Sequence, residues 1–555
     1  MIKLNKLKSL SPRLRRFQKF SMSRLVAGLT LGILGLLLPV FLKFDGLSMA
    51  GHITMGIFLM AAVFWMFEPI PIYSTSMLVI FLQVLLLSIQ GPVFSKAELP
   101  ETIPTQIAEG KWELVSAAVD DGKVYIKTGK NSYRVLQVEI IEQYAGTVVV
   151  KSNGIEPEMI VVSDSKHRLV GYTPPSYTVF FGTLANPIII LFLGGFILAT
   201  GAVKYNLDKN LTNVLLKPFG DKPAFIVLGI MLVTATLSAF MSNTATTAMM
   251  MTVAIPIALQ ANKDDQFRIM LVLSVPIAAN IGGMATPIGT PPNAIVIAAL
   301  NGQGLNIEFG KWMLMMVPLV LLLLVAAWLG LRKLFPPTVQ SFTIKLKGEF
   351  NKSPKAFILY AIFAVTILLW VTEANHGIPS SMIAFLPIAG LTVSGVVGKD
   401  DIRSLPWEVL WLVAGGIALG ISMENTGMAV WLISNIQWSM FPNILLLFIF
   451  GLVAWMLSNF LSNTVAATLL IPLAVSVAVS GIAGEGFSLI ITSLVIGIGC
   501  NIAMLLPIST PPNAIAMSTG FIKTSHMIKI GLLIGSVGVI AFMLFSLVFW
   551  PLLIN

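Results

Sequence analysis

The sequence has little charge and few residues suited to metal or disulfide chemistry. Only 11% of its 555 residues are charged, whereas about a quarter of the residues in a soluble domain are charged. The single cysteine, Cys500, excludes an intrachain disulfide framework and a cysteine-based metal cluster. The histidines are scattered without the spacing of metal ligands: His52, His167, His376 and His526. No paired acid and base is found within an apolar segment, so the sequence predicts that the protein is not an enzyme and has no organic cofactor.

The sequence is rich in long apolar runs. Hydrophobic residues make up 56% of the chain, and runs such as 312–331, 356–372 and 530–550 are long enough to cross a bilayer. The formal net charge is +10, but the basic residues cluster between apolar runs, which favours membrane orientation over nucleic-acid binding. The sequence therefore predicts a multi-pass protein of the bacterial inner membrane, which begins with a basic cytoplasmic arm at 1–24.

One segment, 92–177, has no run of membrane-spanning length. Short stretches there alternate in polarity or are rich in β-branched residues, as in Lys123–Lys127 and Thr147–Val150. Turn residues such as Asp121-Gly122 separate these stretches, which is typical of a small all-β module. Counting the apolar runs that precede the module places it outside the cytoplasm.

Two polar motifs occur twice in the otherwise apolar sequence. Ser-Asn-Thr begins at Ser242 and again at Ser462, and Thr-Pro-Pro-Asn begins at Thr290 and again at Thr510. Both pairs are 220 positions apart, whereas the two Trp-x-x-Glu motifs, the first at Trp65, are 305 positions apart. Because 305 minus 220 leaves 85, close to the length of the β-rich segment, the sequence indicates two matching repeats, the first of which carries an insert.

The distribution of lysine and arginine decides the expected topology. If each Ser-Asn-Thr region is a hairpin, at about 224–260 and about 442–480, every segment rich in Lys and Arg falls on the cytoplasmic side. This favours an all-α polytopic fold with about eleven crossings and two re-entrant hairpins in two inverted repeats, and a C-terminus outside the cytoplasm. The expected segments are the arm (1–24), three helices (25–91), the extracytoplasmic β-rich insert (92–177), the rest of the first repeat (178–335), a cytoplasmic connector (336–355) and the second repeat (356–555).

The duplicated motifs contain the residue types that a site for small ions needs. Proline cannot continue a helix, so Pro291-Pro292 and Pro511-Pro512 are expected to unwind their helices near the middle and to free backbone carbonyls. Ser, Thr and Asn add neutral oxygens, which suit an alkali cation better than a transition metal, and helix N-termini favour an anion. Interhelical hydrogen bonding would explain one motif alone, whereas interrupted segments in matching positions of two repeats are typical of a transporter's binding site.

The duplicated motifs contain neither Lys nor Arg. A dianion in a membrane cavity without a fixed cation is energetically unfavourable. Bound sodium ions would supply the missing positive charge, so the sequence predicts that the anion binds poorly until the cations are bound.

The doubled Ser-Asn-Thr and doubled Thr-Pro-Pro-Asn resemble the motifs of the divalent anion/sodium symporter family, over about 25–90 and 178–550. The resemblance implies sodium-coupled uptake of small divalent anions by a homodimer that works through an elevator-like displacement. It implies a substrate site formed by Asn243, Thr244, Thr290, Pro291, Asn463, Thr464, Thr510 and Pro511. It also implies two sodium sites, formed by Ser238, Ser242, Asn243 and the carbonyl of Gly289, and by Ser458, Asn463 and the carbonyls of Leu461 and Ser509.

The substrate and the coupling stay open. C4-dicarboxylates (succinate, malate and fumarate) are preferred because both motif pairs look like those of the dicarboxylate branch of the family. Sulfate or citrate symport, and dicarboxylate exchange without sodium, are the alternatives, since hydroxyl and amide donors suit each of these anions. A remote alternative is an adaptor or receptor that acts through the β-rich insert. The insert departs from the family pattern, and the sequence does not indicate its role.

Overall fold

The structure, a computed structural model, describes most of the chain. The described residues are 12–42, 44, 47–93, 101–115, 119–120, 122–129, 132–143, 147–162, 174–338, 341, 351–434, 441–479 and 487–554. The chain forms two compact units. One comprises Met1–Thr183 and Ala418–Ile436, and the other comprises Leu184–Ile417 and Gln437–Asn555.

Seven helices in the described ranges are long and apolar enough to cross a membrane. They lie at Met49–Phe67, Tyr177–Lys204, Phe267–Ala285, Phe309–Leu334, Pro354–Val371, Trp407–Asn425 and Thr524–Ile554. Shorter apolar helices, such as Pro223–Ser238 and Asn463–Ala478, lie between them in the sequence. The chain is therefore a multi-pass membrane protein, while about eleven crossings with two re-entrant hairpins stay a prediction.

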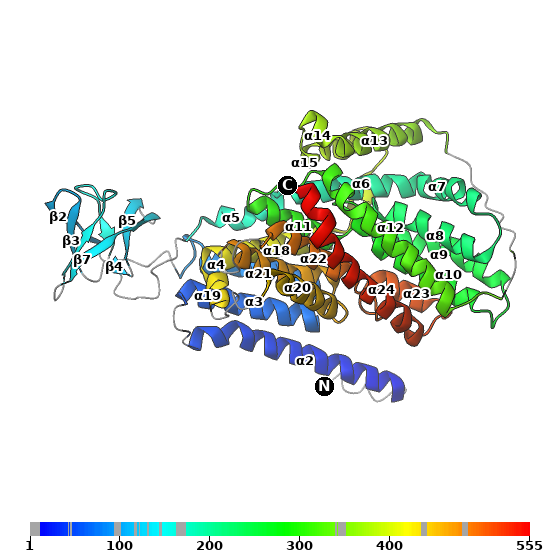
Figure 1. Cartoon of the computed structure of the whole chain (residues 1–555), viewed down its shortest axis with the longest axis horizontal. Coiled ribbons are helices and arrows are strands. Elements are labelled where there is room, and N and C mark those ends of the chain that lie inside the picture. Colours follow the sequence, from blue (N-terminus) through cyan, green and yellow to red (C-terminus); the bar gives the residue numbers. More distant parts are fainter. Residues whose placement is uncertain are drawn as a thin grey trace. The chain divides into compact units, whose positions relative to one another are not determined.

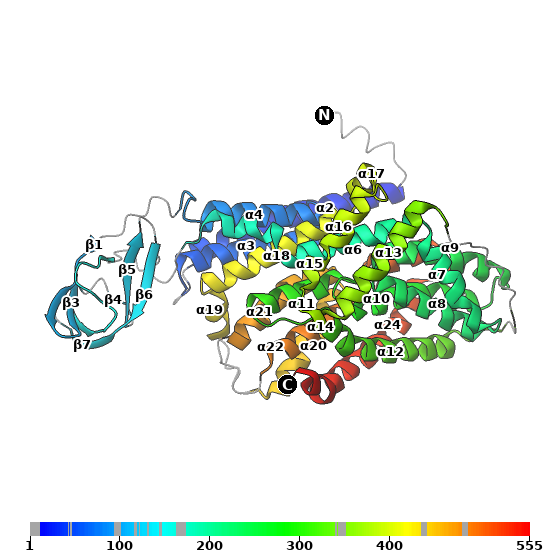
Figure 2. The same ribbon diagram turned by 90° about the horizontal axis from the view of Figure 1, so that it is seen from above.

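The first unit contains a group of helices. α2 and α3 lie side by side (Figures 1 and 2). They approach closely at Gly56, where an added Cβ would lie 2.3 Å from the carbonyl oxygen of Leu36, so a larger residue does not fit without a backbone shift. The helices are α2 (Pro12–Phe41), α3 (Met49–Phe67), α4 (Ile72–Leu87), α5 (Tyr177–Gly182) and α19 (Met428–Ser434).

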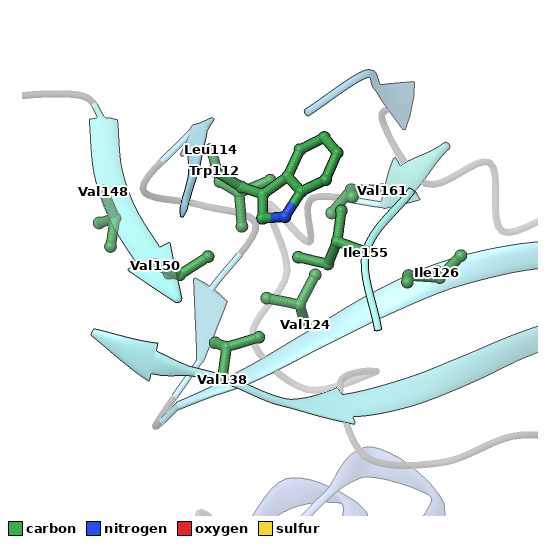
Figure 3. Packing of buried hydrophobic residues seen from close by; sticks show 9 residues of the cluster. All are labelled: Trp112, Leu114, Val124, Ile126, Val138, Val148, Val150, Ile155 and Val161. Atoms are coloured by element: carbon green, nitrogen blue, oxygen red, sulfur yellow. The ribbon is translucent and has the colours of Figure 1, made fainter. Parts of the chain in front are cut away.

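The first unit also contains a β module where the alternating pattern predicts strands. Its described residues form a five-stranded sheet, with the path β1-β9-β5-β4 and β6 paired to β5, and a four-stranded sheet, β2-β3-β8-β7. Val124 and Ile126 of β5 are both buried, as expected when alternate residues of a strand face the core. Trp112 lies in the same core and donates a hydrogen bond from its indole to the carbonyl of Ser152 at 3.2 Å (Figure 3). The strands are β1 (Glu101–Thr102), β2 (Thr105–Ala108), β3 (Lys111–Val115), β4 (Val119–Asp120), β5 (Lys123–Gly129), β6 (Ser132–Gln137), β7 (Glu139–Gln143), β8 (Thr147–Lys151) and β9 (Val161–Val162).

The second unit contains two series of helices that begin at matching positions. The first series is α6 (Pro187–Lys204), α7 (Leu207–Leu216), α8 (Pro223–Ser238), α9 (Asn243–Gln260), α10 (Phe267–Gly282), α11 (Pro291–Gly302) and α12 (Phe309–Leu334). The second is α13 (Pro354–Val371), α14 (Glu373–His376), α15 (Ser380–Ile383), α16 (Phe385–Val393), α17 (Lys399–Arg403), α18 (Trp407–Asn425), α20 (Asn443–Ser458), α21 (Asn463–Val479), α22 (Leu489–Asn501), α23 (Pro511–Ser518), α24 (Thr524–Leu544) and α25 (Trp550–Ile554). The part of α18 from Ala418 onward belongs to the first unit. The starts of α8 and α20, of α9 and α21, and of α11 and α23 are each 220 positions apart, so the offset between the sequence motifs is also the offset between helix starts.

The two series exchange contacts through their short helices. Within the first series, α8, α9 and α10 pack together (Figure 1), and α20, α21 and α22 do the same in the second. The short helix α11, however, packs on α21 and α22 of the other series, and α23 packs on α9 and α10. Each Thr-Pro-Pro-Asn motif therefore begins a helix that lies against the opposite repeat.

Candidate functional site

Both Thr-Pro-Pro-Asn motifs begin a helix rather than interrupt one. Thr290 precedes α11 with φ −141° and ψ 149°, and Thr510 precedes α23 with φ −142° and ψ 147°. The two prolines that follow occupy the first two helical positions in each repeat. Proline is favoured there because its missing N–H is not needed and its φ already suits a helix. We expected the prolines to unwind the helices themselves. The structure instead places the break just before them, after α10 at Gly282 and after α22 at Asn501.

An asparagine in each motif satisfies the backbone of its own break. The side-chain nitrogen of Asn293 donates to the carbonyls of Gly283 and Thr286 at 3.1 and 2.8 Å. Its counterpart Asn513 donates to the carbonyls of Met504 and Leu506 at 3.2 and 3.0 Å. Part of the backbone that the sequence reasoning left free for ions is therefore already hydrogen-bonded, which stabilises a non-helical segment in an apolar environment.

The first Ser-Asn-Thr motif contributes to a compact oxygen-rich cluster. Ser238, which is buried, ends α8, and its Oγ lies 2.6 Å from the side-chain amide of Asn243, the first residue of α9. With its nitrogen turned toward Ser238, the Asn243 amide also donates to the carbonyls of Ala279 and Gly289 at 3.3 Å. Three of the predicted sodium ligands, Ser238, Asn243 and Gly289, therefore lie together. The fourth, Ser242, is the N-cap residue of α9, and its side chain makes no capping hydrogen bond.

A glycine allows the first cluster to contact the break after α10. A Cβ added to Gly283 would lie 2.5 Å from the side-chain amide of Asn243 and 2.5 Å from Cγ2 of Thr290. The start of α9 and the Thr-Pro-Pro-Asn motif therefore meet at Gly283, where only a hydrogen atom fits between them.

The second Ser-Asn-Thr motif repeats this arrangement in part. Ser458 is buried at the end of α20, and its Oγ lies 2.7 Å from Oδ1 of Asn463 and 3.1 Å from the carbonyl of Cys500. The hydroxyl of Ser509 donates to the carbonyl of Asn459, the residue after Ser458, at 3.2 Å. The predicted second sodium site is thus brought together around Ser458, Asn463 and Ser509. Leu461 is two residues before the start of α21.

Two further asparagines, which the sequence reasoning missed, tie the repeats together. Asn501 of the second repeat accepts a hydrogen bond from the Thr290 hydroxyl at 3.0 Å and donates one to Oδ1 of Asn293 at 3.0 Å. In the opposite direction, Asn280 of the first repeat donates to the hydroxyl of Thr510 at 3.2 Å and faces Oδ1 of Asn513 at 3.4 Å. We call these contacts the asparagine brace.

The asparagine brace is buried. Asn280 and Asn501 are each 2% exposed and lie on the apolar helices α10 and α22. A buried amide in an apolar helix is expensive without a partner. The signal in the sequence was therefore one isolated Asn within each apolar run, just before each Thr-Pro-Pro-Asn motif.

The predicted substrate residues differ in exposure between the repeats. Thr244 is exposed, whereas its counterpart Thr464 is 9% exposed. The brace residues Thr290 and Thr510 are buried in both repeats, and Asn243 and Asn463 are half-buried. Pro291 is half-buried, and Pro511 is exposed. The two halves of the candidate site therefore share their backbone geometry but present different side chains to solvent.

The candidate site is electrically neutral apart from its helix ends. The motif residues carry no charged side chain, and the described ranges contain no group of three or more His, Cys, Asp or Glu that could hold a metal ion. Four helices, α9, α11, α21 and α23, begin at the motifs. Hydroxyl, amide and carbonyl oxygens suit a hard cation of low charge, and helix N-termini favour an anion.

Comparisons with known proteins match more than half of the chain. A family model described as "Citrate transporter" matches residues 159–495, a range that contains both Ser-Asn-Thr motifs. An uncharacterized transporter of Haemophilus influenzae is 32% identical over 385 residues, which are 66% of this chain and 82% of that protein. The sodium-dependent dicarboxylate transporter SdcS of Staphylococcus aureus is 29% identical over 411 residues, which are 67% of this chain and 78% of that protein.

Two further matches extend the comparison. The sodium-dependent high-affinity dicarboxylate transporter 3 of Caenorhabditis elegans is 28% identical over 408 residues, which are 62% of this chain and 71% of that protein. The crystal structure of the YdaH transporter of Alcanivorax borkumensis aligns with a TM-score of 0.48 at 12% identity, over 75% of this chain and 94% of that chain.

Proposed function

Because the chain belongs to the citrate transporter family, which its match over residues 159–495 and its relative of 32% identity establish, we propose that it takes up small divalent anions together with sodium. The chain is a membrane transporter and not an enzyme. Relatives named as sodium-dependent dicarboxylate transporters support C4-dicarboxylates, such as succinate, malate and fumarate, as its substrates.

The observation that carries this proposal is a buried serine beside an asparagine at the start of a helix, present once in each repeat. In each pair the serine Oγ lies close to the side-chain amide of the asparagine, at 2.6 Å for Ser238 with Asn243 and at 2.7 Å for Ser458 with Asn463. The hydroxyl and amide groups of both pairs are neutral and contain oxygen ligands. Neither pair is accompanied by a charged side chain within its motif. A dianion at such a site needs cations to offset its charge, so sodium bound at these pairs would make anion binding favourable.

We propose roles for the individual motif residues. The first sodium ion would be held by Ser238, Ser242, Asn243 and the carbonyl of Gly289, and the second by Ser458, Asn463 and the carbonyls of Leu461 and Ser509. The substrate carboxylates would meet the helix starts, at Asn243, Thr244, Thr290, Pro291, Asn463, Thr464, Thr510 and Pro511. Free amides and the helix dipole at these starts favour a carboxylate.

We extend the proposal to the transport cycle. Two inverted repeats with paired interrupted helices suit alternating access, and we propose that a homodimer moves the motif-bearing helices by an elevator-like displacement. The expected topology has about eleven crossings and two re-entrant hairpins, with a cytoplasmic N-terminus and an extracytoplasmic C-terminus.

Uptake into liposomes tests the coupling. Purified protein is reconstituted, and uptake of radiolabelled succinate is measured with an inward sodium gradient, with potassium in its place, and with no cation gradient. We expect accumulation with sodium only. Equal accumulation without any cation gradient would contradict sodium coupling, and uptake that needs internal succinate would indicate an exchanger.

Variants connect the coupling to the two serines. Ser238→Ala and Ser458→Ala each remove one proposed ligand oxygen, so uptake should need a higher sodium concentration while the protein stays folded. Ser518→Ala is the matched control, because Ser518 is exposed on α23 and its hydroxyl bonds only to the carbonyl of Ile515. An unchanged sodium requirement in both site variants would argue against these sodium sites.

Citrate is the second candidate substrate, because the family model that matches is described as a citrate transporter. A thermal-shift comparison of succinate, malate, citrate and sulfate, each in sodium and in potassium, separates the candidates. Stabilisation by citrate but not by succinate would replace the dicarboxylate proposal, and stabilisation by sulfate alone would exclude both.

A further inference from the structure

A cavity of about 510 Å³ lies at the end of α8 opposite to Ser238. It is formed by the first residues of α8 and the last turns of α12, and the residues that define it are Lys222, Phe225, Trp328, Arg332, Pro336 and Pro337. None of these residues belongs to the duplicated motifs, so the proposed transport function does not account for the cavity.

The walls of the cavity are held in place by specific contacts. The indole nitrogen of Trp328 donates a hydrogen bond to the carbonyl of Ala224 at 2.8 Å, which joins α12 to the start of α8. The ring of Phe225 lies 6.2 Å from that of Trp328. The guanidinium of Arg332 lies 6.0 Å from the centre of the Trp328 ring, which restrains its orientation. The cavity therefore has a fixed aromatic wall with a cation beside it.

Two cations line the cavity, and in the described part of the chain neither has an acidic partner. Among the described residues, neither Lys222 nor Arg332 takes part in an ion pair, although the exposed Asp221 is next to Lys222 in the sequence. In addition, no side chain makes a capping hydrogen bond to the first turn of α8, where the helix start carries partial positive charge. The cavity is thus suited to a compact anion such as a phosphate group.

The residues next to the cavity indicate whether such a phosphate would belong to a lipid or be free in solution. α12 is a candidate membrane span, and Leu321, Val325 and Leu329 are about half exposed on the face of α12 that also carries Arg332. From Leu321 through Val325 and Leu329 to Arg332, successive residues are four, four and three positions apart, which is the spacing of residues on one helix face. Phe225 is also 46% exposed. In a bilayer this apolar strip would contact acyl chains, and the cavity at its end would lie at the level of lipid headgroups.

We infer that this cavity binds the headgroup of an anionic phospholipid. The phosphate would lie between Lys222 and Arg332, and the acyl chains would follow Leu329, Val325 and Leu321 along α12. A basic recess between membrane helices is a recognised form of headgroup site. A free phosphate would use the two cations but gain nothing from the apolar strip, so the strip favours the lipid.

Native mass spectrometry of the full chain in detergent tests the inference. The protein is titrated with phosphatidylglycerol, with phosphatidylethanolamine and with glycerol 3-phosphate, which has the headgroup phosphate but no chains. We expect phosphatidylglycerol to be retained in preference to the other two. Each cation near a headgroup contributes about fivefold to binding, so Lys222→Gln with Arg332→Gln should weaken retention roughly 25-fold. Lys222→Gln alone, a change of one exposed side chain, should weaken it roughly fivefold.

A matched double variant controls for net charge. Lys263→Gln with Lys333→Gln removes the same charge from exposed positions that do not line the cavity, and it should leave retention unchanged. Three results would overturn the inference. The first is that phosphatidylglycerol is not retained selectively. The second is that the control and cavity variants lose retention equally. The third is that glycerol 3-phosphate displaces the lipid.

Discussion

At the scale of single residues, the site depends on small and amide side chains that make a helix break stable. Asn293 and Asn513 each donate to two carbonyls of the break that precedes their helix. Asn243 and Asn463 could be predicted as site residues from the sequence, because the Ser-Asn-Thr motif is duplicated. Ser238 and Ser458 lie outside the motif and are indicated only by the family resemblance. The partners of these residues could not be predicted, since Ala279 and Cys500 contribute main-chain carbonyls, and any residue type supplies a carbonyl.

Gly283 gives a prediction at this scale. Gly283→Ala places a Cβ against Asn243 and Thr290, and such overpacking costs about 1–3 kcal/mol of unfolding free energy. We expect a lower melting temperature in detergent and at least a tenfold loss of sodium-dependent uptake, because the cluster around Asn243 must move.

The control for Gly283 is Gly302→Ala at the end of α11, where an added Cβ would meet no atom within 4 Å. It should change the unfolding free energy by less than about 0.5 kcal/mol and leave uptake unchanged. If Gly283→Ala transports as well as the control, Gly283 is not needed to position Asn243.

At the scale of elements, the short helices α11 and α23 link the two repeats. Each begins at a Thr-Pro-Pro-Asn motif, packs on helices of the other repeat, and is held there by the asparagine brace. The prolines predicted a helix break at each motif but not a helix start, although proline is favoured at the first helical positions. The sequence does not predict that each helix packs on the opposite repeat, because this packing depends on tertiary contacts between residues more than 200 positions apart.

The asparagine brace gives a prediction at this scale. In a double-mutant cycle on denaturant unfolding, Thr290→Val and Asn501→Ala should show a coupling energy between about 0.6 and 1.7 kcal/mol, the average and the maximum measured for hydrogen bonds inside a membrane protein. The hydroxyl and the amide are 3.0 Å apart and buried, so each variant removes the same bond.

A cycle that pairs Thr290→Val with Ser518→Ala is the control for the brace. Ser518 is exposed and bonds to its own helix, so the two changes should add to within about 0.5 kcal/mol. Additive energies for Thr290 and Asn501 as well would mean that the contact contributes nothing to the link between the repeats.

At the scale of the whole molecule, the β module lies between α4 and α5 in the chain of a membrane transporter, and the insert is a prediction that its chain ends support. The segments at its two ends meet, because the amide of Ile89 donates to the carbonyl of Pro175 at 2.9 Å and the amide of Tyr177 donates to Oε1 of Gln90 at 3.2 Å. The module also has its own hydrophobic core, which contains Trp112. Removal of the module should therefore leave the ends of its neighbouring helices close enough to be rejoined.

Deletion of the insert tests this organisation. Replacement of residues 95–174 by a short Gly-Ser linker should leave sodium-dependent uptake within roughly threefold of the full chain, since the duplicated motifs and their helices are unchanged. Uptake into liposomes and the melting temperature are the measurements. A folded deletion variant that has lost all uptake would show that the module takes part in transport, and would revive the adaptor interpretation.

The side-chain caps on the two helix breaks have a consequence for how binding is driven. Because Asn293 and Asn513 already fix the irregular backbone, little conformational entropy is left to lose when ions and substrate arrive. If these breaks bind ions and substrate as we propose, their backbone is already hydrogen-bonded before binding, and the free energy of association would be used to move whole helices rather than to order a loop. In the proposed displacement, the asparagine hydrogen bonds would make each non-helical segment move with its neighbouring helices as one rigid body.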